Sequence, residues 1–261
     1  MWRAPLDHLA RVRQEFTRQA ERFACSAAIT DDELTRRFSE AVGPDGTGIV
    51  LDVACGPGIV SAALAAAARE IVAFDLTPQM LDKARQRCRK AGLTNVTFRE
   101  GDATALPFAD GFFDAVVTRL SIHHFKEPRQ VVEEMFRVVK RGGTCVVADI
   151  VSSDSRDEAA LHNALEIWRD PSHVRMLPRA ELVSLIAGAG FAVEAQTTWD
   201  QARKLEEWLS IVDDAERVGP LRTVMRALAT AGESAGMGLS LAGGEIGFVH
   251  RWHLIAARKK A

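Results

Sequence analysis

The chain has 261 residues, of which 47% are hydrophobic, so it can bury one sizeable core and a smaller cap. Its net charge of -2 gives no general attraction to nucleic acid or anionic membranes, and no uncharged apolar run approaches membrane-spanning length. Charged residues interrupt the N-terminal apolar residues where a secretory signal would be continuous, and the four cysteines lack metal-ligand spacing. We therefore expect a cytoplasmic protein with reduced thiols and no metal site.

The first 40 residues are predicted to form a helical cap. Apolar residues recur there at helical spacing, with arginine and glutamate between them: Leu6, Leu9, Val12, Phe16, Ala20 and Phe23. Asp31 and Asp32 favour the start of a second helix, because acidic side chains are stabilised at a helix N-terminus. Turn residues at 43–46 predict its end.

Residues 49–58 predict a buried strand that ends in a glycine turn. The run before the turn is apolar except for Asp52, which suits a parallel strand covered on both faces. Gly56 and Gly58 allow a sharp turn and the close approach of a ligand to the backbone. Residues 59–68 are strong helix formers, so the segment predicts a nucleotide-sized site at the carboxyl end of a sheet.

The next two predicted strands both end at an acidic residue. Residues 71–74 lead to Asp75, and residues 96–101 lead to Asp102. Carboxylates at successive strand ends can accept hydrogen bonds from a ribose diol and from an adenine amino group. The sequence therefore predicts an adenosine site beside the glycine turn.

The remaining chain continues the alternation of helices and strands. Helices are predicted at 78–90, 129–139, 158–169 and 178–188, and strands at 112–118, 144–150, 191–198 and 247–257. Residues 200–240 are predicted to insert helical material before the last strand. Four glycines in this region, Gly236, Gly238, Gly243 and Gly244, are interpreted as a loose connection.

The strand-end motifs resemble those of the class I S-adenosylmethionine-dependent methyltransferases. Within that class they resemble the small-molecule branch that includes the ubiquinone and menaquinone-biosynthesis C-methyltransferases. The matching segments are residues 51–58, 74–81, 101–103, 106–108 and 113–114. The resemblance is specific for the cofactor, S-adenosylmethionine, whose product would be S-adenosylhomocysteine, and says little about the acceptor.

The resemblance implies an α/β fold with a doubly wound, seven-stranded, mostly parallel sheet and an antiparallel last strand. This is the Rossmann-like methyltransferase fold with a helical lid. It implies a single domain over residues 1–261, with a cap at 1–40, a cofactor-binding core at 41–150 and a substrate-side half at 151–261. The insertion at about 200–245 is expected to form part of the lid.

The cofactor-binding residues follow from the motifs and from the resemblance. Asp75 is expected to bind the ribose, and Asp102 with the Ala103 backbone the adenine amino group. The other expected cofactor residues are Asp52, Gly56, Gly58, Leu76, Met80 and Arg119. In the resembling family the Phe23 position is often a tyrosine that reaches the polar end of the cofactor, and phenylalanine cannot make that hydrogen bond.

Three histidines are candidates for a catalytic base: His123, His124 and His173. The first two follow the fourth strand, and because adjacent residues point different ways, at most one should face the site. His173 belongs to a polar cluster at 169–175 that is expected to line the acceptor pocket or to form an ion-paired loop. Three tryptophans near the lid, Trp199, Trp208 and Trp252, favour an aromatic or hydrophobic small-molecule acceptor.

Three alternatives remain open at this point. A methyltransferase acting on a macromolecule is disfavoured for nucleic acid by the near-neutral charge and by the sequence Thr118-Arg119-Leu120-Ser121 where an adenine-specific motif would stand. A nicotinamide dehydrogenase would suit Asp75, yet Ser61 replaces the third glycine of its motif and Asp102 has no role in it. A third alternative keeps the cofactor pocket without methyl transfer. The oligomeric state is left open.

Overall fold

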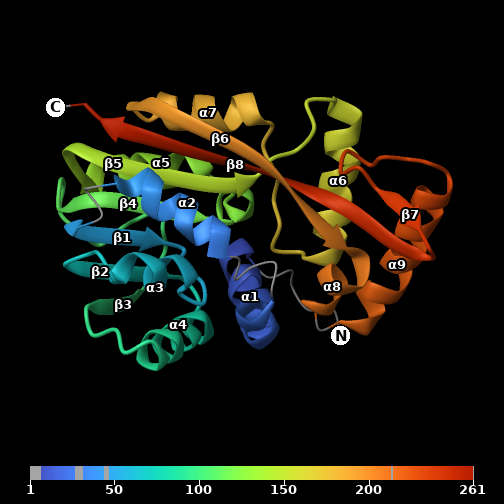
Figure 1. Cartoon of the computed structure of the whole chain (residues 1–261), viewed down its shortest axis with the longest axis horizontal. Coiled ribbons are helices and arrows are strands. Elements are labelled where there is room, and N and C mark those ends of the chain that lie inside the picture. The colour runs from blue at the N-terminus through green and yellow to red at the C-terminus, as the bar shows by residue number, and fades with distance from the viewer. Residues whose placement is uncertain (1–6, 27–31, 44–46, 213, 261) are drawn as a thin grey trace.

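A twisted sheet forms the centre of the molecule (Figure 1). The computed structural model describes residues 7–26, 32–43, 47–212 and 214–260. In that part of the chain the strands are β1 (Ile49–Val53), β2 (Glu70–Asp75), β3 (Val96–Glu100), β4 (Phe113–Arg119), β5 (Val139–Ile150), β6 (Phe191–Lys204), β7 (Ser240–Ala242) and β8 (Glu245–Lys259). Their order is β3-β2-β1-β4-β5-β8-β6, and β7 pairs with β8. β1 to β5 are parallel, whereas β8 is antiparallel to β5 and β6.

Helices cover both faces of the sheet. Successive residues of a strand point to opposite faces, and the central strands are mainly apolar, so both faces need a cover. The helices are α1 (His8–Cys25), α2 (Asp32–Val42), α3 (Ile59–Ala65), α4 (Pro78–Lys90), α5 (Pro128–Val138), α6 (Arg156–Arg169), α7 (Arg179–Gly188), α8 (Leu205–Ser210) and α9 (Ala215–Thr230), with a 3-10 turn η2 (Ile122–His124). Val50 packs with α2 and α3 on one face, and its neighbour Leu51 packs with α5 and α7 on the other. The predicted doubly wound sheet with an antiparallel last strand is confirmed.

Two details of the predicted sheet are wrong. The short strand β7 adds an eighth strand, because Gly243 and Gly244 form a tight turn with positive φ angles of 58° and 84° that pairs Ala242 with Glu245. We had interpreted these glycines as a loose connection. Residues 200–204 are strand and not helix, since β6 continues to Lys204 opposite Gly247.

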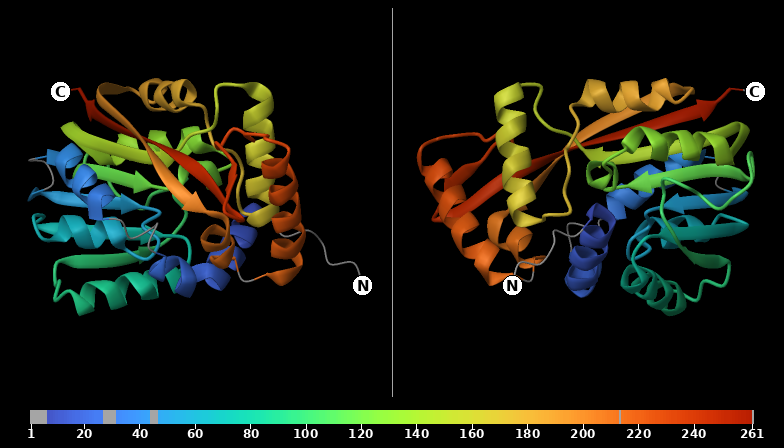
Figure 2. Two further views of the ribbon diagram at one scale, coloured as in Figure 1. Left: turned by 45° about the vertical axis from the view of Figure 1, so that its right-hand side comes forward. Right: turned by 180° about the vertical axis from the view of Figure 1, so that it is seen from behind.

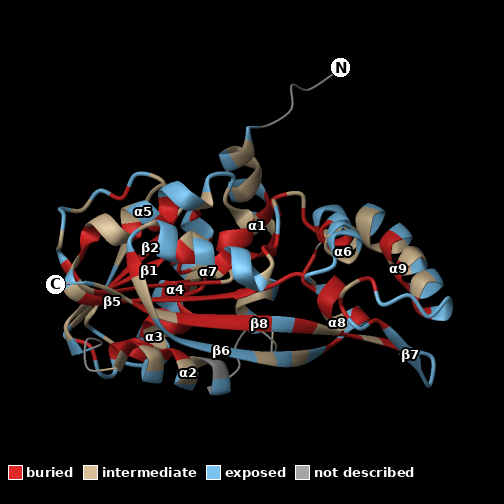
Figure 3. Cartoon of the chain, turned by 90° about the horizontal axis from the view of Figure 1, so that it is seen from above, coloured by how far each residue is buried: buried red, intermediate tan, exposed pale blue. Residues whose placement is uncertain are grey.

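The ends of β6 and β8 project beyond the main core into a second hydrophobic cluster. Figure 1 shows β8 crossing the whole molecule toward α8 and α9, and Figure 2 shows the same arrangement from behind. Trp208 of α8, Leu221 and Met225 of α9, and Phe248 of β8 are buried in this cluster. We call the part formed by α6, α8, α9 and β7 the lobe. Figure 3 shows that the β7 hairpin remains exposed at its edge.

Helix α1 lies between the lobe and the carboxyl edge of the sheet, and polar contacts hold it on both sides (Figure 1). On the lobe side, Glu15 accepts two hydrogen bonds from Arg217, at 3.0 and 2.9 Å. On the sheet side, Thr17 donates to Gln79 at 2.8 Å. The predicted cap is therefore a helix that bridges two separate hydrophobic clusters.

A few predicted features fall on parts of the chain that the structure does not describe. Leu6 of the helical pattern, Asp31 at the expected start of the second helix, and residues 44–46 of the expected turn lie outside the described residues. Among the described helices, none is both long enough and apolar enough to cross a membrane. All four cysteines are free: Cys25, Cys55, Cys88 and Cys145.

Replacing Gly58 by alanine should destabilise the fold. Its φ of 73° is left-handed, and an added Cβ would come within 2.7 Å of the Ala84 Cβ on α4. Left-handed strain of about 1 kcal/mol and overpacking of about 1–3 kcal/mol both oppose folding. We expect a clear fall in the urea midpoint. Gly92→Ala is the control, because its φ is 69° but nothing lies within 4 Å; equal losses for the two variants would contradict this packing role.

Replacing Arg217 by alanine should loosen α1. Glu15 is only 2% exposed and would lose its bidentate partner, at a cost of roughly 1–3 kcal/mol. We expect faster amide hydrogen exchange in α1 with little change in β1 or β4. Arg222→Ala on the same helix removes an exposed pair with Glu206 and serves as control, with an expected cost below about 1 kcal/mol. Unchanged exchange in α1 would show that its polar contacts do not hold it.

Candidate active site

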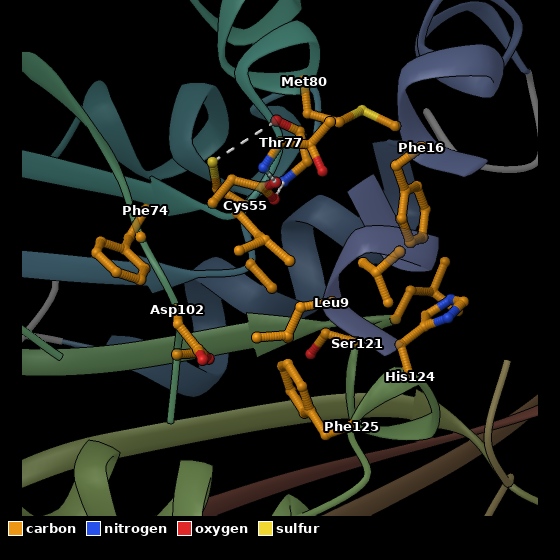
Figure 4. Close-up of a pocket in the computed structure, with 18 of the residues that line it drawn as sticks. Leu9, Phe16, Cys55, Phe74, Thr77, Met80, Asp102, Ser121, His124 and Phe125 are labelled. Atoms are coloured by element: carbon orange, nitrogen blue, oxygen red, sulfur yellow. Dashed lines mark hydrogen bonds between the residues drawn. The ribbon is translucent and has the colours of Figure 1, made fainter. Parts of the chain in front are cut away.

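A cavity of about 390 Å³ opens at the carboxyl edge of the sheet, between the strand ends and α1 (Figure 4). Its size is in the range of cofactor and ligand pockets. Figure 4 shows Phe74 and Asp102 on one side of the cavity and Phe16 and His124 on the opposite side. The predicted cofactor residues that line it are Asp52, Gly56, Asp75, Leu76, Met80, Asp102, Ala103 and Arg119.

Gly58 is the one predicted cofactor residue that does not line the cavity. Its missing side chain makes room for Ala84 of α4, so it serves helix packing, and its expected contact with the cofactor stays a prediction. Gly56 differs, because a Cβ there would meet no atom within 4 Å and would project into free space. The two glycines of the turn therefore have different physical roles.

Asp75 ties the end of β2 to the glycine turn. Its Oδ2 accepts from the Gly56 amide and its Oδ1 from the Thr77 amide, both at 2.8 Å. Burial raises the pKa of this carboxyl to about 6, and the backbone hydrogen bonds oppose the rise. Each oxygen keeps a further lone pair, so Asp75 can still accept from the hydroxyls of a ligand.

The backbone is strained at the ends of two neighbouring strands. Ala54 after β1 has a φ of 53°, and Leu120 after β4 has a φ of 51°. Side-chain-bearing residues adopt this region at a cost of about 1 kcal/mol or more, and such strain clusters at functional sites. Both residues line the cavity, so the strain turns the chain around its floor.

Asp52 lies beneath the glycine turn and accepts from the Ser61 hydroxyl at 2.5 Å. Burial raises its pKa to about 7, with the Ser61 hydrogen bond opposing and the nearby Asp75 charge adding to the rise. Two buried carboxyls at one end of the cavity favour a cationic group of a ligand over an anionic one. Arg119 lies nearby, with its guanidinium carbon 5.4 Å from the centroid of the Trp252 ring.

At the other end of the cavity, Asp102 follows Gly101 after β3. One of its carboxyl oxygens accepts from the Thr104 amide at 2.9 Å, which fixes the turn, and the other oxygen has no hydrogen-bond partner among the described residues. Met80 is almost fully buried yet borders the cavity, so it serves both the core and the site. This end of the cavity combines apolar side chains, such as those of Phe74 and Met80, with the free carboxyl oxygen of Asp102 as an acceptor.

Helix α1 covers the cavity with its apolar side. Leu9, Val12, Phe16 and Phe23 line the cavity, while the charged residues between them make the contacts to the lobe and to α4. Phe16 packs edge-on against the His124 ring, with 4.9 Å between the ring centroids. The apolar side of α1 thus forms the cover of the site, and the sequence predicts this segment only as a helical cap.

A smaller chamber of about 50 Å³ adjoins the cavity on the lobe side. The two spaces share four lining residues: Phe16, Phe23, Leu120 and His124. The chamber has a larger polar share of its wall than the cavity, and its polar side chains include His123, Glu166, Arg169, Asp170, His173, Arg203 and His250. Trp208 and Trp252 also line it, while Trp199 stacks behind Trp252 at 5.6 Å between ring centroids.

The three candidate histidines gather around this chamber but differ in their chemistry. His123 forms a 2.6 Å hydrogen bond through Nδ1 to Asp149, and this carboxylate raises its pKa against the effect of burial. His124 donates from Nδ1 to the Ser172 carbonyl oxygen at 3.1 Å, and burial followed by the His123 charge lowers its pKa to about 4.

His173 is held by Asn163. Its Nε2 donates to the Asn163 side-chain oxygen at 2.9 Å, because the amide nitrogen of Asn163 donates to Ala159 instead. Burial and the His123 charge lower the pKa of His173 to about 2. Of the three, only His123 has a pKa above the ordinary histidine value, because the raising effects outweigh burial only there.

Another buried cluster contains His162, Glu166 and His250, whose possible ligand atoms all lie within 4.8 Å of one another. The donor set does not fit a metal. Arg203 donates to Nδ1 of His250 at 2.9 Å, so in a neutral ring the proton is on Nε2, the atom that faces Glu166. Glu166 is also paired with Arg169 at 3.1 Å, which leaves little negative charge for a divalent cation.

Comparison with known proteins decides the family. Residues 51–147 match the model of a methyltransferase domain. A demethylmenaquinone methyltransferase of Clavibacter sepedonicus is 40% identical over 63% of this chain and 74% of its own. The chain belongs to the family of S-adenosylmethionine-dependent methyltransferases. That membership removes the dehydrogenase alternative.

Two further similarities agree with the methyltransferase assignment. An uncharacterized methyltransferase of Bacillus subtilis is 30% identical over 61% of this chain, and the match spans 63% of its own length. A solved Bacillus halodurans structure with a provisional methyltransferase name has a TM-score of 0.80 and 28% identity, covering 87% of this chain and 99% of that one.

The family's cofactor, S-adenosylmethionine, fits the residues of the cavity. Free space at Gly56, oxygens of Asp75 that can accept from hydroxyls, and an acceptor on Asp102 beside apolar side chains suit an adenosine moiety. The buried acids Asp52 and Asp75 suit the cationic end of S-adenosylmethionine. The individual cofactor contacts remain predictions.

Sequence reasoning missed two groups of residues in this methyltransferase. Asp149, the partner of His123, lies near the carboxyl end of β5, and the same signal that singled out Asp75 and Asp102 could have found it. His250, Arg203 and Glu166 come from distant elements, and no spacing in the sequence connects them.

Replacing Asp75 by asparagine should weaken the binding of S-adenosylhomocysteine by about 10- to 100-fold. An amide has one acceptor oxygen and no charge, and a hydrogen bond to a charged group contributes about 1.5–3 kcal/mol. In the unaltered protein, affinity should fall as the pH drops through about 6, because the carboxylate then gains a proton. Asp75→Asn should show a smaller change with pH, because only Asp52, whose pKa is raised to about 7, still titrates there, as calorimetric titration at pH 5 and pH 7.5 would measure.

The matched control for this prediction is Asp82→Asn. Asp82 lies on α4 and forms an exposed pair with Arg85, so the same chemical change should leave the affinity unaltered. Equal affinity of Asp75→Asn and the unaltered protein would refute a role for Asp75 in ribose binding.

Proposed function

We propose that this chain transfers the methyl group of S-adenosylmethionine to a small molecule with an aromatic or otherwise apolar body. The observation that carries the proposal is the cavity itself, where acids from neighbouring strand ends face the apolar side of α1. When bound, S-adenosylmethionine supplies a methyl group that is already electrophilic. The protein then has to align an acceptor with that group and exclude water.

The roles of the residues follow from their positions. Asp75 would hold the ribose hydroxyls, and Asp102 with the Ala103 backbone would hold the adenine edge. Asp52 supports the glycine turn through Ser61 and adds negative charge near the cationic end of the ligand. Phe16 and Phe23 of α1 close the cavity on the side of the chamber, where an acceptor would meet the methyl group.

The nature of the acceptor is supported by the relatives and by the cavity wall. One relative is named a demethylmenaquinone methyltransferase, and that name describes a quinone-type acceptor for that protein. Phe16, Phe23, Leu120 and His124 line both the cavity and the chamber, and their mainly apolar side chains suit an acceptor with an apolar body. The net charge of -2 offers no attraction to nucleic acid as the acceptor.

Titration with S-adenosylmethionine and transfer of its labelled methyl group to a panel of phenols and hydroquinones test the proposal. We expect saturable binding and labelled product, with binding weakened in Asp75→Asn. Lack of binding at about 1 mM ligand would refute the cofactor assignment, since natural cofactor sites bind well below that level. Binding with no transfer to any probe would instead favour a cofactor pocket used without methyl transfer.

A further inference from the structure

We infer that the polar chamber receives an ionisable hydroxyl of the acceptor, that His123 takes its proton, and that Asp149 positions His123 for this step. The inference rests on the proposed methyl transfer. It deepens that proposal because it restricts the acceptor to molecules that must lose a proton, such as phenols and enols. It also distinguishes His123 from the other two candidate histidines.

The first observation is the tautomer of His123. Its Nδ1 is 2.6 Å from Oδ1 of Asp149, and Oδ2 of the same carboxylate accepts from the His123 amide at 3.4 Å. A carboxylate only accepts, so Nδ1 carries the proton and Nε2 keeps its lone pair. Nε2 has no hydrogen-bond partner among the described residues, and His123 lines the chamber.

The second observation is the rigidity of Asp149. It is 2% exposed near the carboxyl end of β5, where Ile150 pairs with Trp252 of β8. The Ile150 amide donates to Oδ1 of Asp149 at 2.7 Å, so the acceptor atom for His123 is fixed by the sheet. Because a strand holds the carboxylate, it holds the ring in one orientation.

The third observation is the contrast with the other imidazoles around the chamber. His124 donates to Ser172, His173 donates to Asn163, and His250 accepts from Arg203, so none of them pairs with a carboxylate through Nδ1. Three carboxylates favour the charged form of His123: Asp149, Glu166 and Asp170. The other charged or titratable side chains of the chamber oppose this charged form of His123 or complete the lining of the chamber. They are His124, His173, Arg169, Arg203 and His250.

The position of the chamber supports the same role. It shares Leu120 and His124 with the cavity, so a hydroxyl inside it lies next to the end where Asp52 and Arg119 would face the cationic part of the cofactor. In the transfer step the hydroxyl proton passes to Nε2 of His123 while the oxygen forms its bond to the methyl carbon. The electron pair of the broken carbon–sulfur bond stays on sulfur, and His123 later releases the proton to water.

Nuclear magnetic resonance of the histidine nitrogens tests the inference without any acceptor. With S-adenosylhomocysteine bound, we expect His123 to be protonated on Nδ1 when neutral and to titrate above the ordinary histidine value of about 6.5. Asp149→Asn should lower that pKa and mix the two tautomers. Asp200→Asn is the matched control, because Asp200 forms an exposed pair with Arg251 and should leave His123 unchanged.

Turnover provides the second measurement, with catechol and hydroquinone as probes. We expect kcat to rise with pH through the His123 pKa, and to fall by about 100-fold or more in His123→Gln while affinity for S-adenosylmethionine stays the same. Asp149→Asn should lower kcat and move the pH profile to lower pH, a shift that a merely structural role would not cause.

Three results would overturn the inference: a His123 pKa at or below the ordinary value, no change of that pKa in Asp149→Asn, or equal kcat in His123→Gln and the unaltered protein. Absence of cofactor binding by the unaltered protein would instead refute the proposed function. Failure of the inference and failure of the proposed function are therefore distinguishable. If neither probe is methylated, the nitrogen titration alone decides the inference.

Discussion

The hydrogen bond from the Gly56 amide to Asp75 joins the ends of two neighbouring strands, and the shape of the cavity depends on it. The parallel register brings Val53 opposite Phe74, so the chain leaves β1 and β2 at the same edge. Asp75 is buried, and a buried carboxylate without partners would be costly. Its two backbone donors remove that cost and hold the glycine turn around open space, at the expense of left-handed strain at Ala54.

Helix α1 completes the site without belonging to either hydrophobic cluster. Its charged side bonds to the lobe through Glu15 and to α4 through Glu21, while its apolar side covers the cavity. Because each of these polar contacts contributes only about 1 kcal/mol net, the cover depends on many of them acting together. The long antiparallel pair of β6 and β8 makes this possible, since it carries the lobe to the far side of α1 (Figure 1).

The site therefore has two compartments with different chemistry. The cavity suits a cofactor with an apolar ring and a cationic end, and the chamber beside it is polar and small. Within the chamber, identical imidazoles differ because their neighbours differ. A carboxylate raises the pKa of His123, whereas burial lowers that of His173 to about 2. Residue type alone does not assign a base; the partner on Nδ1 does.

The sequence by itself determined the alternation of strands and helices and the acids at strand ends, because these are local patterns of burial and turn formation. The doubly wound sheet was implied by the resemblance to a family. The contiguous motifs at residues 51–58 and 74–81 also indicated the family, which the comparison with known proteins confirmed. Only the tertiary structure decided that Gly58 packs against Ala84, that Phe16 covers the cavity, and that Asp149 meets His123. Those contacts join residues far apart in the chain, and their partners depend on how β8 and α1 are placed, which no local pattern contains.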